Sequence, residues 1–254
     1  MITSRANPLI KMARGLRQSR ARHETGLFLV EGLQPVGAAI EADWEIEALL
    51  YVPRLLGSKF ADGLLARYRG RLEEVSETVL ESVAEKEHPQ GIVAIARQRH
   101  TTLASTAPGR LGAALVSAQD PGNVGTILRT LEAAGGPVLY LLDGGVDPYH
   151  PTAIRAAMGA TFAITVIEAQ MEEFLAWRKT HGVHLIGTSA RAERDYREVK
   201  PRQPWILLLG NEQKGLSDIQ RQACDVVVSL PMRGRASSLN LAVAAGILLF
   251  AYAE

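Results

Sequence analysis

Short apolar segments alternate with amphipathic segments through the second half of the chain, and this alternation constrains the fold more than any other feature. The apolar segments are typical of buried strands and the longer segments between them of helices. Strands that alternate with helices favour a mainly parallel sheet covered by helices on both faces. We therefore predict an α/β fold, with strands near residues 113–117, 138–142, 162–167, 184–187, 206–209 and 226–230.

The helices of this half are predicted near residues 124–134, 152–158, 172–181 and 216–223. A last apolar helix is predicted near the C-terminus. It opens on side chains of the kind that cap helix N-termini, Ser237, Ser238 and Asn240.

The first hundred residues show the same alternation on a smaller scale. Asn7 followed by Pro8 is typical of a helix start. Further helices are predicted over residues 59–68 and 77–87, and strands over 27–30, 48–52 and 92–96. A run rich in Thr, Ser, Ala, Pro and Gly then lacks any hydrophobic period. We predict a domain over residues 1–99, a linker over 100–110 and a second domain over 111–254.

The composition excludes several classes of protein. Cys224 is the only cysteine, so no intrachain disulfide can form, and a reducing compartment fits. One cysteine and six scattered histidines give no zinc framework, so we expect no metal. The longest apolar run, over residues 239–252, is too short to cross a bilayer. We therefore expect a cytoplasmic protein without a membrane segment.

Charge is balanced over the whole chain but not along it. The net charge is +1, which by itself indicates no nucleic-acid partner. The first 22 residues nevertheless contain no acid and six basic residues: Arg5, Lys11, Arg14, Arg17, Arg20 and Arg22. Such a run is usually a solvated face, and contact with phosphates is the alternative.

Three polar loops follow predicted strands, and ligands of parallel sheets bind at the carboxyl ends of strands. The first loop spans residues 119–125, the second 210–215 and the third 230–240. Each alone is equally typical of a capped helix or a tight turn, and neither a G-x-x-x-x-G-K-[ST] nor a G-x-G-x-x-G pattern occurs. Together they place five polar side chains where a strand ends or a helix begins: Asn123 (the expected helix cap), Arg129, Glu212, Ser238 and Asn240.

These loops resemble the motifs of a known family. The three motifs of the SpoU/TrmH class of SPOUT RNA methyltransferases are similar to PGNVGTILRTLEAAG, LLLGNEQKGLS and LPMRGRASSLNLAVAAGILLF, in that order. The stretch DGGVDPYHPTAIRAAMGA resembles the segment between the family's first two motifs. The segments NPLIKMARGLR and GLFLVEG are similar to the family's small N-terminal RNA-binding domain, an α/β domain with a ribosomal-protein L30e/L7Ae-like fold.

The resemblance implies a fold and a cofactor. The second domain would be a SPOUT α/β domain with a deep trefoil knot, which general rules of chain topology would not suggest. It would bind S-adenosylmethionine and methylate a ribose 2′-hydroxyl of RNA, and family members are typically homodimers. Residues matched to the family's cofactor contacts are Thr188, Gly210, Leu230 and Leu239.

The resemblance also assigns catalytic residues. Arg129 matches the family's proposed catalytic residue, but arginine stays protonated in proteins. We therefore interpret Arg129 as the group that holds the adjacent phosphate and stabilises the developing oxyanion, and a role as proton acceptor stays open. Glu212 would orient Arg129 through an ion pair, Ser238 and Asn240 would position the target nucleotide or Arg129, and Asn123 would fix the first loop.

Beside such a site, phosphate contact becomes the better interpretation of the basic N-terminal run. The residues expected to bind RNA are Arg5, Lys11, Arg14 and Arg17. The two-domain plan favours ribosomal RNA as the substrate. The alternatives are a tRNA 2′-O-methyltransferase, a non-catalytic RNA-binding or ribosome-assembly protein, and a base methyltransferase of the wider superfamily.

Overall fold

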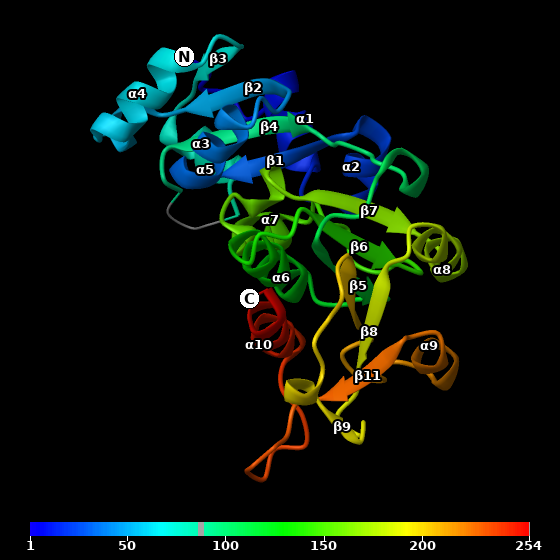
Figure 1. Cartoon of the computed structure of the whole chain (residues 1–254). Helices are drawn as coiled ribbons and strands as arrows, with labels where there is room; N and C mark the ends of the chain where they lie inside the picture. The colour runs from blue at the N-terminus through cyan, green and yellow to red at the C-terminus, as the bar shows by residue number, and fades with distance from the viewer. Residues whose placement is uncertain (86–88, 254) are drawn as a thin grey trace. The chain divides into compact units, whose positions relative to one another are not determined.

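The computed structural model describes residues 1–85 and 89–253, and it divides the chain into two compact units (Figure 1). The first unit contains Met1–Arg99 and Asp147–Phe162, and the second contains His100–Val146 and Ala163–Glu254. This division differs from the continuous second domain expected over residues 111–254. Residues 147–162 interrupt the second unit in sequence and pack with the first.

The first unit is built on a four-stranded mixed sheet with the strand order β1-β4-β2-β3. The strand β4 pairs antiparallel with β1 and β2, and β3 runs parallel to β2. Its strands are β1 (Leu27–Glu31), β2 (Ile46–Tyr51), β3 (Leu72–Glu74) and β4 (Ile92–Arg97). Its helices are α1 (Pro8–Gly15), α2 (Ser19–Thr25), α3 (Leu33–Glu41), α4 (Lys59–Arg67), α5 (Glu77–Val83) and α7 (Pro151–Ala157), with short 3₁₀ turns η1 (Pro53–Leu55) and η3 (Ala160–Phe162).

The segment 147–162 belongs to the first unit because aromatic and charged side chains fix it there. The Phe162 ring lies edge-on to Trp44, with 5.2 Å between the ring centroids. The buried guanidinium of Arg22 donates to Asp147 over 2.7 Å and to two backbone carbonyls at the end of α1. These donors and acceptors satisfy an arginine that is only 1% exposed.

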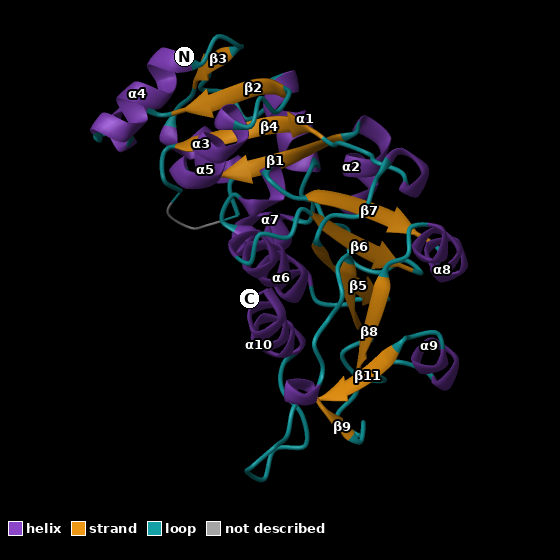
Figure 2. Ribbon diagram, in the orientation of Figure 1, coloured by secondary structure: helices purple, strands orange, loops and turns teal. Residues whose placement is uncertain are grey.

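The second unit is built on a seven-stranded sheet with the order β7-β6-β5-β10-β8-β11-β9, and all its strand pairs are parallel (Figure 2). In Figure 2 the helices α6 and α10 lie on one side of this sheet and α8 and α9 on the other. Its strands are β5 (Leu111–Val116), β6 (Val138–Leu142), β7 (Thr165–Ala169), β8 (His184–Thr188), β9 (Arg194–Asp195), β10 (Trp205–Leu209) and β11 (Val226–Ser229). Its helices are α6 (Pro121–Ala133), α8 (Met171–Thr180), α9 (Asp218–Gln222) and α10 (Leu241–Ala253), with 3₁₀ turns η2 (Leu103–Ser105) and η4 (Tyr196–Glu198).

This architecture confirms the predicted parallel α/β sheet. The central strands β5, β6 and β10 are buried along their whole length, which is why each reads as an unbroken apolar run. Because the strands run parallel, the loops after β5, β8, β10 and β11 all leave at the carboxyl edge of the sheet.

Several local expectations need correction. Residues 100–110 were expected to link the two domains, but they belong to the second unit: the Trp177 indole donates to the Thr106 carbonyl, and Leu103 packs on the core of that unit. The helix expected over residues 77–87 ends at Val83, and residues 86–88 lie outside the described part. The expected linker is therefore part of a folded unit. No helix of the described residues is long and apolar enough to cross a membrane.

Candidate active site

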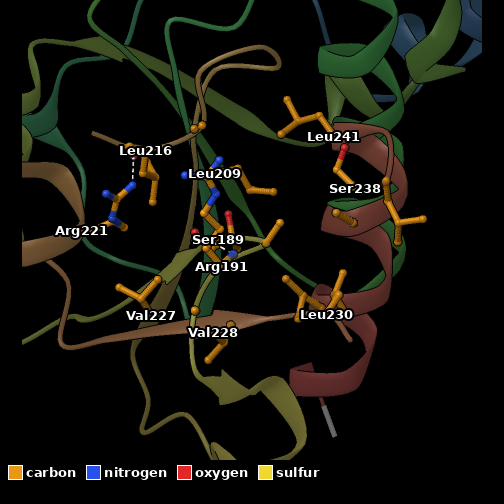
Figure 3. A pocket seen from close by; sticks show the side chains of 18 of the residues that line it. Ser189, Arg191, Leu209, Leu216, Arg221, Val227, Val228, Leu230, Ser238 and Leu241 are labelled. Carbon is orange, nitrogen blue, oxygen red and sulfur yellow. Dashed lines mark hydrogen bonds between the residues drawn. The ribbon is translucent and has the colours of Figure 1, made fainter. Parts of the chain in front are cut away.

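A cavity of about 1060 Å³ opens at the carboxyl edge of the second unit's sheet. Its walls come from the segments that follow β8, β10 and β11 and from the first turns of α10. Figure 3 shows Leu209 at the end of β10, Val228 in β11, Ser238 in the loop before α10 and Leu241 at the start of α10 around this space. A cavity of this size, with mixed polar and apolar walls, can hold a ligand of cofactor size.

The structure brings together residues that are up to about fifty positions apart in the chain. All four residues predicted to contact a cofactor line the cavity: Thr188, Gly210, Leu230 and Leu239. Of the five predicted catalytic residues, Glu212 and Ser238 are among the lining residues. Asn123, Arg129 and Asn240 are not among them.

Backbone packing at Gly210 shapes one wall of the cavity. The loop after β10 folds back through a bridge between Asn211 and Gly215. A methyl group on Gly210 would lie 2.1 Å from the carbonyl carbon of Gly215 and 2.3 Å from the amide nitrogen of Leu216. Only glycine fits such a close approach of two backbone segments. The apolar strand followed by glycine signals this turn in the sequence.

Glu212 joins the second loop to the first. Its carboxylate accepts hydrogen bonds from the backbone amides of Gln119 and Asp120, at 3.1–3.2 Å, and from the Asn123 side chain, at 3.3 Å. Asn211 adds a second link, because its side-chain amide donates to the Ser117 carbonyl over 2.9 Å. Sequence reasoning missed this role of Asn211, although its place directly after the glycine of the second motif was a usable signal.

Asn123 lies between the three loops and does not cap a helix. The cap of α6 is Asp120, whose carboxylate accepts from the Gly122 amide over 2.7 Å, and Pro121 occupies the first turn. Asn123 is therefore one turn inside α6, where it is only 6% exposed. Its side-chain oxygen accepts from the Asn240 side chain over 3.0 Å, while its amide donates to Glu212. The expected cap at Asn123 was wrong, and the side chain instead closes a chain of hydrogen bonds.

Asn240 has two roles at the third loop. Its side-chain oxygen accepts from the amides of Ala242 and Val243, so it caps α10. Its side-chain nitrogen donates to Asn123. The expected capping role is confirmed for Asn240, whereas Ser237 and Ser238 precede the helix in the loop. The result is a continuous chain from Glu212 through Asn123 to Asn240, which ties all three loops together.

Arg129 lies on the exposed face of α6, away from this chain of hydrogen bonds. Six residues separate it from Asn123, and at about 100° per residue the two side chains point in different directions. Among the described residues, the side chain of Arg129 makes no hydrogen bond or ion pair, so the expected pair with Glu212 is not formed. The physical reason is that Glu212 is turned toward the loop amides. The Arg129 guanidinium therefore keeps all its donors available.

An ion pair between Arg178 and Asp225 supports β8 and β11 beside the cavity. The Arg178 guanidinium donates to Asp225 over 2.7 Å and to the Ala223 carbonyl over 2.6 Å. The Asp225 carboxylate also accepts from the Leu185 amide at 2.7 Å. Sequence reasoning did not single out this pair, because its members are separated by 47 positions. It fixes the start of β11 against β8.

Cys224 is next to this pair, and burial raises the pKa of its thiol to about 12. We expect iodoacetamide at pH 8 to alkylate the folded protein on the order of 10³-fold more slowly than the protein unfolded in urea, because the thiolate is the nucleophile. Mass spectrometry of the modified chain over time measures both rates. Equal rates in the two states would contradict a buried, protonated thiol.

The four residues expected to bind RNA belong to the first unit and differ in their surroundings. Arg5 and Arg17 donate to the carbonyls of Thr78 and Val83 in and near α5. Lys11 and Arg14 are exposed on α1, without a side-chain partner among the described residues. Part of this basic run is therefore structural, while Lys11 and Arg14 leave their charges free.

Within the described part of the chain, no three or more His, Cys, Asp or Glu side chains are grouped so that they could hold a metal ion.

Comparison with known proteins decides the family. The model of the SpoU rRNA methylase family matches residues 110–250, which contain all three loops. The chain belongs to the SpoU rRNA methylase family. A second family model, the MRM3-like substrate binding domain, matches residues 7–94. The two matches correspond to the sheets of the two structural units.

Relatives in the SpoU family match nearly the whole chain. A 23S rRNA (uridine(2479)-2′-O)-methyltransferase of Streptomyces viridochromogenes is 34% identical over 246 residues, covering 93% of this chain and 85% of the relative. The 23S rRNA (guanosine(2553)-2′-O)-methyltransferase RlmP of Bacillus subtilis is 30% identical, covering 98% of this chain and 97% of the relative. The crystal structure of an AdoMet-bound rRNA methyltransferase from Sinorhizobium meliloti has a TM-score of 0.88 and 37% identity, with 98% and 95% of the two chains covered.

Proposed function

We propose that this protein transfers the methyl group of S-adenosylmethionine to a ribose 2′-hydroxyl of ribosomal RNA. The observation that carries the proposal is the chain of hydrogen bonds from Glu212 through Asn123 to Asn240, which joins the three SpoU motifs beside one cavity. The names of the similar proteins support ribosomal RNA as the substrate. Those two names specify uridine and guanosine, so the target base does not follow from similarity. A protein that modifies this RNA is expected in the cytoplasm.

The residues that line the cavity suit S-adenosylmethionine. Leucines from three segments, Leu209, Leu216 and Leu230, give apolar walls suited to an adenine ring. Gly210 and Gly215 both line the cavity, so their backbone groups are candidates to bind the edge of a base. The segment 189–194 adds polar and charged side chains that suit the methionine end. When bound, the cofactor supplies a methyl group on a positively charged sulfur.

The protein's own residues would orient the ribose and stabilise the charge that develops on its oxygen. A free guanidinium can hold a phosphate with two parallel hydrogen bonds. Arg129 is such a group, since Glu212 is occupied by the loop amides and does not neutralise it. We infer that Arg129 binds the phosphate next to the target ribose and stabilises the developing oxyanion. Ser238, at the cavity wall, would position the target nucleotide.

We also propose that two copies of the chain pair through α6 and α10. The helix α10 is apolar on all sides, yet Val243, Ile247 and Phe250 are 51%, 39% and 52% exposed. These side chains are spaced at i, i+4 and i+7, so they form one stripe. The helix packs closely on α6, where a methyl group on Gly246 would lie 3.5 Å from the Thr130 side chain. An exposed apolar stripe of this kind can be buried against the same stripe of a second copy of the chain.

Replacing Val243 by Glu is expected to separate the dimer. A carboxylate in the middle of an apolar interface loses its hydration without gaining a partner. The free-energy cost of that desolvation is larger than the free energy that the apolar contacts contribute. Light scattering after size exclusion should give twice the chain mass for the wild type and one chain mass for Val243→Glu. The matched control is Ile219→Glu, an apolar side chain of α9 that is 78% exposed. A Val243→Glu protein that stays dimeric would contradict this interface.

The finer topology of both units is part of the proposal. We propose that the C-terminal part of the second unit forms the deep trefoil knot of the SPOUT fold. The return of α10 to α6 and β10, after the chain has passed through β11, supports this threading. We propose further that the first unit has the L30e/L7Ae-like fold, and its mixed four-stranded sheet packed with helices agrees with that class.

A methyl-transfer assay tests the proposed function. Purified protein is incubated with tritiated S-adenosylmethionine and a transcript of 23S ribosomal RNA, and the product is hydrolysed in alkali. A 2′-O-methyl group blocks cleavage at the adjacent phosphodiester, so the label should appear in alkali-resistant dinucleotides. Label released in mononucleotides would indicate a base methyltransferase, and no incorporation would contradict catalysis.

A further inference from the structure

The loop between β11 and α10 carries charged side chains that take no part in the hydrogen bonds from Glu212 to Asn240 and do not line the cavity. It contains no helix or strand, and in Figure 1 it extends beyond the ends of β11 and α10 as the orange-red segment. Its two ends line the cavity through Met232 and Ser237. Its tip, between those residues, presents Arg233 and Arg235, both exposed. Arg233 and Arg235 therefore lie on a loop whose two ends line the cavity.

Neither arginine of the tip is neutralised within the described residues. No hydrogen bond or ion pair joins the side chain of Arg233 or Arg235 to another described group. Asp195 is close enough for Arg233 to contribute to its low pKa, but its main partner is Arg197, whose hydrogen bonds hold that pKa at about 2. The Asp195 carboxylate is therefore already occupied.

The residues that line the cavity add further positive charge. Arg191, Arg194 and Lys214 line the cavity, and their side chains form no ion pair with any residue that the structure describes. Within the same part of the chain, Glu193 is the one lining carboxylate without a hydrogen-bond partner. S-adenosylmethionine carries one carboxylate and two positive groups, so it needs at most one cation for its own binding. The remaining arginine and lysine side chains are therefore available to bind a second anion with more negative charge.

We infer that Arg233 and Arg235 bind the RNA phosphates that flank the target nucleotide. This inference rests on the proposed function, because a ribose 2′-hydroxyl that reaches the cavity brings its neighbouring phosphates to the mouth. Arginine binds phosphate through two parallel hydrogen bonds. A methyl group on Gly234, between the two arginines, would meet no atom within 4 Å, so the tip has room to approach a nucleic-acid backbone. The contacts position the substrate and carry no base specificity.

The test is the salt dependence of RNA binding by the double variant Arg233→Ala/Arg235→Ala. Affinity for a 23S rRNA transcript is measured by filter binding over a series of KCl concentrations. Loss of two phosphate contacts should lower the affinity roughly 10- to 50-fold at 0.1 M salt and reduce the log–log salt slope by roughly 1.5. The KM for RNA in the methyl-transfer assay should rise by a similar factor. Affinity for S-adenosylmethionine, measured by calorimetry, should not change.

Two further variants distinguish phosphate binding at the loop from a general effect of net charge. The variant Lys179→Ala/Arg202→Ala removes the same charge from the opposite edge of the sheet, at the amino ends of the strands. Lys179 lies in the last turn of α8, and the Arg202 amide donates to the His184 ring at the start of β8. This variant should bind RNA like the wild type. Arg233→Lys/Arg235→Lys keeps the charge and should recover most of the affinity.

The possible results are distinguishable. Unchanged RNA affinity and slope in the alanine variant, with an active wild type, would overturn the inference and leave the proposed function intact. An equal loss in the Lys179/Arg202 control would assign the effect to net charge and also overturn it. Weaker cofactor binding with unchanged RNA binding would assign the loop to the cofactor and overturn it as well. A wild type that neither binds nor methylates the transcript would refute both the function and the inference.

Discussion

Replacing Arg129 by Ala should lower kcat for methyl transfer by roughly 10²- to 10³-fold, the loss typical of removing one donor to a developing oxyanion. Affinity for S-adenosylmethionine should stay the same, because Arg129 is not among the residues that line the cavity. Arg129→Lys should recover only part of the rate, since lysine keeps the charge but cannot bind a phosphate through two parallel donors. Single-turnover methyl transfer and calorimetry measure the two quantities separately.

Glu132→Ala provides the control for this prediction. Glu132 is exposed on the same helix, three residues further on, and has no side-chain partner among the described residues. Its variant should keep the wild-type rate. Near-normal turnover by a folded Arg129→Ala protein would remove Arg129 from the catalytic machinery. If Arg129→Ala also weakened cofactor binding, the loss of rate would come from a changed cofactor cavity.

Replacing Gly210 by Ala should weaken cofactor binding and destabilise the fold. The new methyl group would lie 2.1 Å from backbone at Gly215, and no side-chain rotation can relieve that contact. The loop after β10 would have to move, which displaces Glu212 and one wall of the cavity. We expect destabilisation of about 3 kcal/mol from overpacking and a fall in affinity for S-adenosylmethionine of at least roughly tenfold. Thermal unfolding and calorimetry give the two values.

Gly234→Ala is the matched control, since a methyl group there meets nothing within 4 Å and the residue has no positive φ. It should unfold at the wild-type temperature and bind the cofactor normally. If Gly210→Ala also bound S-adenosylmethionine with wild-type affinity, the tight turn would not form the cofactor wall.

The parallel sheet could be predicted because its central strands are buried on both faces and therefore read as apolar runs. The strand order could not, since β10 lies between β5 and β8 although it follows both in the chain. The association of residues 147–162 with the first unit was also missed. It depends on tertiary contacts, such as the pair between Arg22 and Asp147, that span 125 positions.

The sequence predicted which residues belong to the site better than it predicted the contacts between them. The four residues matched to cofactor contacts all line one cavity, although their roles in binding stay a prediction. The error at Asn123 was avoidable, because Asp120 followed by Pro121 is a stronger helix start. The absent pair between Arg129 and Glu212 was partly foreseeable from helix periodicity, which places Asn123 and Arg129 on different faces. The hydrogen bonds from two backbone amides to Glu212 could not be foreseen, because the identity of a side chain does not show which donors a neighbouring loop offers it.

The most direct test of the central claim is a crystal structure of the protein with S-adenosylmethionine. We expect the cofactor in the cavity at the carboxyl edge of the seven-stranded sheet, in contact with Gly210 and Leu230. Cofactor density at another place, or an empty cavity at millimolar cofactor, would contradict this claim.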